Sequence, residues 1–375
     1  MQTRDTVIIG GGMAGLGCAR TLQDAEYNDF ALLSEDIGGS VCVGADQHTN
    51  YGAFYVRKDY EHIQKYVQKT RRIRPGEGRF FRKGVAVPYL AWKSALHLPS
   101  LVRLYFFLRK YKKNYIKFRK LSETQSQKSV IDRVPFFKYM YTSSATNIFK
   151  KIGCEYWADN FINPVYWATA FSDIRNATGA SVATVSLPFI VPSHEFILDI
   201  KKLTRGFEQK IHQDTVLEIQ RVHGTWIIKT KNGKTWSARH VVLAVPTHIA
   251  QKLISIPEKT NTPRRGSLLH IRGTLKPPYN TGSYVFIDSP GLYMATKQYR
   301  GTILLIAERE DIDLDRYFSE YKIIGKKEWY PAFVIGKHLI ESDRGEGMYL
   351  IGGHNAPTME DAFITGIYAA NQILK

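Results

Sequence analysis

Three glycines near the start of the chain have the spacing that a phosphate-binding turn requires. The motif Gly10-x-Gly12-x-x-Gly15 directly follows a short apolar run and precedes a helix-like stretch. The first glycine permits a tight turn, the second lets the backbone approach a pyrophosphate, and the third lets the helix lie close to the strand. The helix N-terminus, which includes Met13 and Ala14, offers unpaired N–H groups and a positive dipole end. The motif therefore predicts dinucleotide binding.

An acidic residue and a second pair of glycines follow at the end of the next apolar run. The run at residues 30–33 is followed by Ser34 and Glu35. Glu35 lies about 20 residues past the turn, where an acid binds the ribose hydroxyls of an adenine dinucleotide. Gly38, Gly39 and Ser40 come next. Because NAD dehydrogenases do not usually have this second pair of glycines, it indicates a different dinucleotide.

Apolar periodicity indicates the strands and helices that position these residues. Residues 7–9 are typical of a buried strand, and apolar residues recur at helical spacing over residues 16–22. Residues 216–246 indicate strands joined by a hairpin turn at Asn232-Gly233. The C-terminal segment indicates a strand, a pair of glycines, and a helix that starts near residues 358–359.

These segments together resemble the FAD-dependent amine oxidase, phytoene desaturase and protoporphyrinogen oxidase superfamily, which has the glutathione-reductase-like FAD fold. The resemblance covers both ends and the middle of the chain. It implies an α/β fold in which an FAD-binding Rossmann-like domain is interleaved with an α+β substrate domain containing an antiparallel sheet and helices. The expected limits are 1–78, 205–265 and 330–375 for the FAD-binding domain, and 79–204 and 266–329 for the substrate domain.

The same resemblance implies where FAD contacts this chain. The first glycine turn would hold the pyrophosphate, Glu35 the adenosine ribose, and Val216 the adenine through its backbone. Residues 352–353 would follow the ribityl chain, and the Met359 N–H would face the flavin ring. The full set of implied contacts is Gly10, Gly12, Met13, Ala14, Gly15, Glu35, Gly38, Gly39, Ser40, Tyr51, Gly52, Ala53, Val216, Ala244, Gly352, Gly353, His354 and Met359.

Two positions depart from the pattern of the superfamily. Ser40 stands where an arginine usually follows the paired glycines, and Gly353 stands where an acidic residue is usual. The first change removes a charge-assisted phosphate contact. We therefore expect modest affinity for FAD.

Aromatic and histidine residues are the candidates for the reacting face. In this superfamily the flavin N5 exchanges a hydride with the substrate, while the protein orients the donor carbon and excludes water. The candidate catalytic residues are Trp329, Tyr330 and His270, and further cavity candidates are Tyr51, Tyr166 and Trp167. Amine oxidases of the superfamily often have a lysine near N5. Residues 267–274 contain no lysine, which favours the desaturase-like branch.

Composition limits the class of protein. The 375 residues carry a net charge of +18, and 44% of them are hydrophobic. No window approaches the roughly 20 consecutive apolar residues that span a bilayer. The N-terminus enters a strand, which argues against a cleavable signal peptide. The three cysteines lack CxxC spacing, so we expect neither disulfides nor a metal site, and a cytoplasmic setting.

Much of the positive charge lies in one aromatic segment, residues 98–121, which contains no acidic residue. Leu101, Leu104, Tyr105 and Leu108 recur at helical spacing, and Tyr111 and Tyr115 continue the stripe. One interpretation is a helix whose apolar stripe is buried and whose solvated face is basic. A second is an interfacial helix on an anionic membrane. The third, nucleic-acid binding, is not expected because no recognised motif accompanies the charge.

Four functions are consistent with these features. The leading hypothesis is an FAD-dependent oxidoreductase, desaturase-like or oxidase-like, that acts on an apolar substrate, with a peripheral position on the inner face of the membrane. The alternatives are a flavin enzyme without net redox change, such as a mutase or isomerase with an anionic substrate, a soluble amine oxidase, and a scaffold that has lost catalysis. The residues leave open the substrate, the direction of hydride transfer, the electron acceptor and the oligomeric state.

Overall fold

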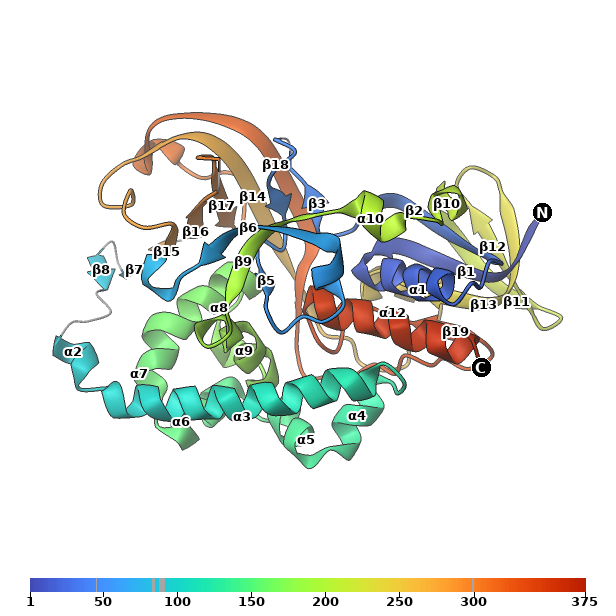
Figure 1. The fold of residues 1–375 in the computed structure, drawn as a ribbon, viewed down its shortest axis with the longest axis horizontal. Coiled ribbons are helices and arrows are strands. Elements are labelled where there is room, and N and C mark those ends of the chain that lie inside the picture. Colours follow the sequence, from blue (N-terminus) through green and yellow to red (C-terminus); the bar gives the residue numbers. More distant parts are fainter. Residues whose placement is uncertain (45, 83–84, 88–91, 290, 299) are drawn as a thin grey trace.

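The computed structural model describes residues 1–44, 46–82, 85–87, 92–289, 291–298 and 300–375. Figure 1 shows one sheet that contains β1 (Gln2–Gly12) and β2 (Phe30–Gly38), and a second sheet that contains β14 (Thr262–Leu275) and β18 (Phe318–Ile335). A layer of helices lies along one side of both sheets (Figure 1). The predicted α/β fold with an additional antiparallel sheet is confirmed.

The first sheet is parallel at its centre. Its strand order is β10-β2-β1-β13-β12-β11, with β19 also pairing with β13. The central strands pair in parallel, while β11, β12 and β13 form an antiparallel extension. Strands with both faces covered show continuous apolar runs, as at residues 7–9. The remaining strands are β10 (Ile211–Gln213), β11 (Val216–Val222), β12 (Thr225–Thr230), β13 (Thr235–Leu243) and β19 (Met348–Leu350).

Two helices from opposite ends of the sequence cover one face of this sheet. They are α1 (Met13–Asp24) and α12 (Met359–Ile373), which lie side by side in Figure 1. The helices cross at Gly17 and Gly366. A Cβ on Gly17 would lie 2.5 Å from the carbonyl oxygen of Phe363, and one on Gly366 would overlap the carbonyl oxygen of Ala14. The crossing therefore requires glycine on both helices.

The second sheet is mainly antiparallel. Its order is β18-β14-β17-β16-β15-β7-β8, in which only β15 and β7 pair in parallel. The predicted domain limits stay a prediction, and three of them fall inside β7, β14 and β18. The other strands are β7 (Gly78–Arg82), β8 (Val85–Val87), β15 (Tyr284–Ser289), β16 (Leu292–Lys297) and β17 (Ile303–Ala307).

Short strands and a group of helices complete the fold. The strands are β3 (Cys42–Val43), β4 (Asn50–Tyr51), β5 (Val56–Arg57), β6 (Val67–Ile73) and β9 (Ser193–Leu198). The helices are α2 (Trp92–Ala95), α3 (Leu98–Ser122), α4 (Gln127–Arg133), α5 (Pro135–Thr142), α6 (Ala145–Ile152), α7 (Glu155–Trp157), α8 (Asn163–Ala170), α9 (Gly179–Ser186), α10 (Ile200–Thr204) and α11 (Thr247–Leu253).

The basic aromatic segment forms α3, and its buried stripe is confirmed at Leu104, Leu108, Tyr111 and Tyr115 but not at Leu101 and Tyr105. The buried residues are Leu104, Leu108, Tyr111, Tyr115, Phe118 and Arg119. Leu101 and Tyr105, expected in the stripe, are 38% and 44% exposed. The neighbouring helices pack against the side of α3 that carries Leu104. Leu101 and Tyr105 lie beside that contact and remain exposed. Among the described residues no helix is long and apolar enough to cross a membrane.

Candidate cofactor site

The first glycine turn has the backbone that its motif predicts. Gly10 has a φ of +112°, and a Cβ there would lie 2.5 Å from the carbonyl oxygen of Ala244. A Cβ on Gly15 would overlap the carbonyl oxygen of Gly10. Gly12 differs from both, because the nearest atom to an added Cβ would be 3.9 Å away, on Gly39. Gly10 and Gly15 are thus required by the fold, whereas a Cβ on Gly12 would make only an ordinary van der Waals contact.

The start of α1 is available to an anion. Gly12 is the N-cap residue, and no side chain among the described residues caps this terminus. Met13 and Ala14 form the first turn, which contains no acidic residue. A helix N-terminus without an internal cap presents N–H groups and a positive dipole end. This terminus therefore suits a pyrophosphate.

The second pair of glycines lies directly beside the first turn. Gly12 pairs with Gly38 at the end of the β1–β2 ladder. A Cβ on Gly39 would lie 2.9 Å from the Cα of Gly12. Gly52, with a φ of +85°, approaches the carbonyl oxygen of Ser40 so closely that a Cβ would overlap it. Ala53 follows and contacts the apolar core around α1 and α12.

Ser34 is a residue of this turn that the sequence did not single out. Its hydroxyl accepts a hydrogen bond from the N–H of Gly11 at 2.8 Å and donates to the carbonyl oxygen of Asp36 at 2.6 Å. It thereby joins the two glycine segments. A serine at a strand end before an acidic pair is a weak signal, because such residues are common in turns.

The predicted adenosine contacts also meet at one place. Glu35, at the end of β2, accepts a hydrogen bond from the hydroxyl of Thr215 at 2.7 Å. Val216 follows Thr215 and begins β11. The side chain of Gln213 donates to the carbonyl oxygen of Glu35 at 3.2 Å. Glu35 and Val216 therefore flank the same corner of the parallel sheet.

The C-terminal segment reaches the glycine turn through the sheet. Ala244 donates its N–H to the carbonyl oxygen of Ile9, and Ile351 donates to that of Leu243. Gly352 and Gly353 follow β19, and a Cβ on either would have no atom nearer than 3.7 Å. A Cβ on either glycine would make only ordinary van der Waals contacts, so neither position needs glycine for lack of space.

His354 is buried next to these glycines. Its Nε2 has no hydrogen-bond partner among the described residues. Burial, together with the charge of Arg344, lowers the pKa of His354 to about 4. The ring is therefore neutral at physiological pH, with one nitrogen available to a ligand.

Buried charges hold the N-terminus of α12, where Met359 is the first residue. The carboxylate of Glu360 accepts N–H groups from His62 at 2.8 Å and Ile63 at 3.0 Å. Asp361 accepts hydrogen bonds from Arg119 Nε at 2.7 Å and from the hydroxyl of Tyr115. These contacts connect α12 to α3, although the partners are distant in the sequence.

The candidate catalytic residues occupy two different environments. His270, fully buried on β14, bonds through Nδ1 to the hydroxyl of Tyr51 at 3.1 Å and through Nε2 to that of Thr302 at 2.8 Å. Burial lowers the pKa of His270, which nearby Asp46 only partly opposes. Trp329 contacts this cluster, and its Nε1 is buried without a partner among the described residues.

Tyr330 lies apart from that cluster. Its side chain is 54% exposed and contacts His248, with ring centroids 5.3 Å apart. Successive residues of β18 point to opposite faces, which explains the difference from Trp329. Two of the further cavity candidates, Tyr166 and Trp167, lie on α8 in the helical layer. Tyr166 is buried and bonds to Ser181, and Trp167 stacks on Tyr293.

Two other features lie away from the glycine turns and the candidate catalytic residues. An open concavity of about 420 Å³, lined by residues including Arg4, Lys210 and His212, lies at the amino ends of the parallel strands. Cofactors of such sheets bind at the carboxyl ends.

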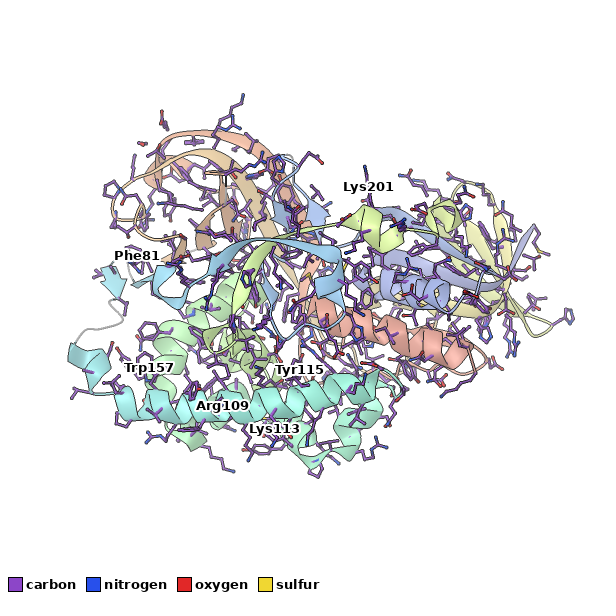
Figure 2. All side chains as sticks on the ribbon, in the orientation of Figure 1. Phe81, Arg109, Lys113, Tyr115, Trp157 and Lys201 are labelled. Carbon is purple, nitrogen blue, oxygen red and sulfur yellow. The ribbon has the colours of Figure 1, made fainter. Side chains whose placement is uncertain are left out.

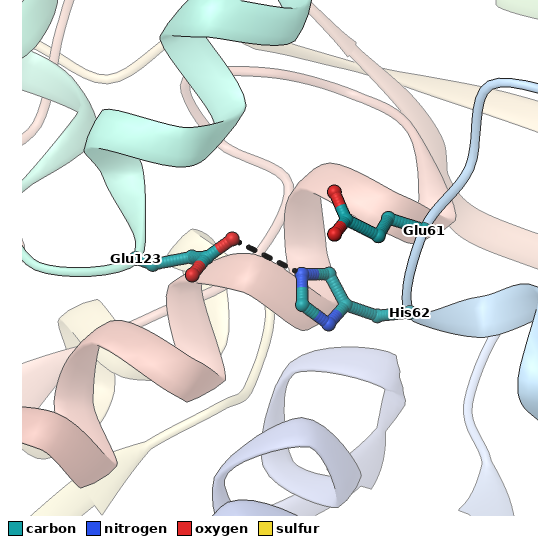
Figure 3. Close-up of side chains that lie close together, drawn as sticks. All are labelled: Glu61, His62 and Glu123. Atoms are coloured by element: carbon teal, nitrogen blue, oxygen red, sulfur yellow. Dashed lines mark hydrogen bonds and ion pairs between the residues drawn. The ribbon is translucent and has the colours of Figure 1, made fainter.

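The side chains of Glu61, His62 and Glu123 also lie close together (Figure 3). His62 Nε2 is 3.3 Å from Glu123, and Lys120 pairs with the same carboxylate, so these groups already satisfy one another.

The described geometry places the first glycine turn, the second pair of glycines, Gly52 and the start of α1 next to one another in a protein with two sheets. No family model matches the sequence, and no curated protein matches it.

Solved structures with the same fold provide a further comparison. The CLA-producing fatty acid isomerase from P. acnes superposes with a TM-score of 0.72 at 15% identity, covering 99% of this chain and 98% of that one. A putrescine oxidase variant has a TM-score of 0.69 at 12% identity, covering 100% and 99%. A reduced UDP-galactopyranose mutase has 0.60 at 14%, covering 100% and 94%. At these identities the likeness shows the fold, and it confirms the fold that the sequence resemblance implied.

Proposed function

We propose that this protein is an FAD-dependent oxidoreductase that acts on an apolar substrate at a membrane surface. The observation that carries the proposal is the convergence of two glycine turns, from residues 10–15 and 38–40, with Gly52. Gly352 and Gly353 join the same region because they follow β19, which pairs with β13 beside β1. When bound, the flavin supplies a hydride acceptor or donor at N5.

Different residues of the chain bind different parts of FAD. The N–H groups at the start of α1 bind the pyrophosphate, and Glu35 binds the ribose. Met359 presents its N–H from the start of α12, which the buried carboxylates of Glu360 and Asp361 hold in place. Because Ser40 supplies no charge, binding of the phosphates depends on backbone donors.

At the reacting face the protein orients the substrate and excludes water. His270 acts as a positioning residue, because both its ring nitrogens are engaged and its lowered pKa keeps it neutral. It fixes the hydroxyl of Tyr51, while Trp329 Nε1 remains available as a donor. β14 contains no lysine, which favours a carbon substrate over an amine.

A flavin reaction without net redox change is the second candidate. The fold likeness to a fatty acid isomerase, over almost the full length of both chains, supports it. A fold alone does not determine the reaction. This candidate also suits an apolar substrate, since that neighbour is a fatty acid isomerase.

The purified protein tests these candidates directly. We expect a flavin absorbance spectrum that bleaches when a membrane lipid extract is added without oxygen. A shifted double bond in the lipid, without lasting bleaching, would indicate the isomerase-like reaction. Hydrogen peroxide release with simple amines would indicate an amine oxidase. Failure to bind FAD would overturn the proposal.

A further inference from the structure

The outward face of α3 is divided into an apolar half and a basic half. Leu98, Val102 and Phe106 lie one turn apart and are exposed, Phe106 by 61%. The same line continues through Arg109, Lys113 and Lys117, which are also exposed. Figure 2 labels Arg109 and Lys113 on this helix together with Tyr115, which is buried. We call the exposed line from Leu98 to Lys117 the α3 face.

Both ends of α3 are fixed to the protein, so the α3 face is a rigid surface. Arg103 donates to the carbonyl oxygens of Ile152 and Gly153 at 2.9 and 3.1 Å. At the other end Arg119 bonds to Asp361 at 2.7 Å. The exposed apolar residues are therefore not a consequence of a loosely held helix.

The charge on α3 itself is of one sign, and the exposed Asp132 of the neighbouring α4 pairs with Lys128. Residues 98–122 contain no aspartate or glutamate. The first acid beyond them, Glu123, already pairs with Lys120 at 3.2 Å. The neighbouring helices α5 and α6 add the exposed Lys138, Lys150 and Lys151.

We propose that the α3 face docks on an anionic lipid bilayer, with its apolar half in the headgroup region and its basic half on lipid phosphates. An amphipathic helix of this kind binds through both apolar burial and attraction to anionic lipid. A nucleic acid would leave Val102 and Phe106 in contact with a polyanion. The inference deepens the membrane part of the proposed function, and α3 also contacts α12, where the flavin ring would lie.

Co-sedimentation with vesicles tests the basic half. We expect the full-length protein to bind phosphatidylcholine vesicles that contain about 30% phosphatidylglycerol, and to bind pure phosphatidylcholine much less. Changing Lys110, Lys113 and Lys117 to Gln lowers the affinity about 100-fold. The control changes Lys231, Lys234 and Lys252 to Gln. These exposed lysines lie on the parallel-sheet half, and their loss alters the net charge equally.

A second pair of variants tests the apolar half. Val102→Ser with Phe106→Ser lowers vesicle affinity about tenfold while the salt dependence remains. The control is Leu217→Ser with Val222→Ser, which removes two exposed apolar side chains from β11. Thermal melting of all variants checks that each is folded.

Three results overturn the inference. They are equal binding to neutral and anionic vesicles, equal losses in the control variants, and displacement from vesicles by a single-stranded oligonucleotide that binds more tightly. Flavin absorbance in the same samples separates this inference from the proposed function. Bound flavin without vesicle binding refutes the docking alone, and vesicle binding by a protein that takes up no flavin refutes the cofactor alone.

Discussion

The glycines of the first turn impose different steric demands on the chain. Gly12→Ala is expected to fold, because its Cβ would meet no atom nearer than 3.9 Å. An alanine N-cap costs no more than about 1 kcal/mol of unfolding free energy. FAD affinity should fall about tenfold or more, since the methyl group would occupy the approach to the phosphates. Urea unfolding and a flavin fluorescence titration measure both quantities.

Gly15→Ala is the matched comparison for that substitution. Its Cβ would overlap the carbonyl oxygen of Gly10, so the fold should lose about 1–3 kcal/mol even without cofactor. Equal destabilisation of the cofactor-free protein by both alanines would contradict the view that Gly12 serves phosphate binding and not the fold.

His354 makes the stability of the protein depend on pH. Its pKa of about 4 in the folded state lies below the ordinary value near 6.5. As the pH falls from about 6.5 to 4, the unfolded chain binds a proton that the folded chain does not. The protein should therefore lose about 3 kcal/mol over this range, and none above it.

Urea unfolding at several pH values, without cofactor, measures this loss. His354→Asn should flatten the pH dependence, whatever its effect on absolute stability. His223→Asn, in an exposed hairpin, should leave the slope unchanged. An unaltered slope in His354→Asn would assign the effect to other groups.

At the scale of elements, the crossing of α1 and α12 sets the distance between the glycine turn at the start of α1 and Met359 at the start of α12. Gly366→Ala would place a methyl group against the backbone of α1 at Ala14. We expect a loss of about 1–3 kcal/mol in unfolding free energy and weaker FAD binding, since Met359 would move. Gly76→Ala is the control, because no atom lies within 4 Å of its Cβ.

The elements that could be predicted from sequence are those specified by neighbouring residues. The glycine turn, the hairpin at Asn232-Gly233 and the start of α12 at Met359 each depend on a few consecutive side chains. The crossing of α1 and α12 could not be predicted in this way. A close approach depends on the partner helix, more than 300 residues away along the chain.

The same reasoning explains the errors at α3. Arg119 belongs to the basic segment, but it is buried against Asp361 and does not face solvent. Its partner is 242 residues away in sequence, so periodicity alone could not identify the pair. Tyr330 likewise shares a predicted segment with Trp329 but is exposed. Which face of β18 is covered depends on the fold of the whole chain.

At the scale of the whole molecule, FAD should stabilise the protein as a unit. The candidate contacts come from both ends and the middle of the chain. A ligand that binds only the folded state adds about 2.7 kcal/mol at a concentration 100 times its Kd. Thermal unfolding with and without FAD measures this effect. Adenosine monophosphate, which reaches only the Glu35 end, should give a smaller increase, and an unchanged transition with FAD would contradict the site.

The contact of α1 with α12 also has a consequence for synthesis on the ribosome. The buried face of α1 emerges more than 300 residues before the helix that covers it. At about 5–20 residues per second, that apolar surface stays uncovered for tens of seconds. The nascent polypeptide is therefore a candidate client for chaperones that bind near the ribosomal exit. A fragment that contains α1 but ends before α12 should aggregate after its release from the ribosome.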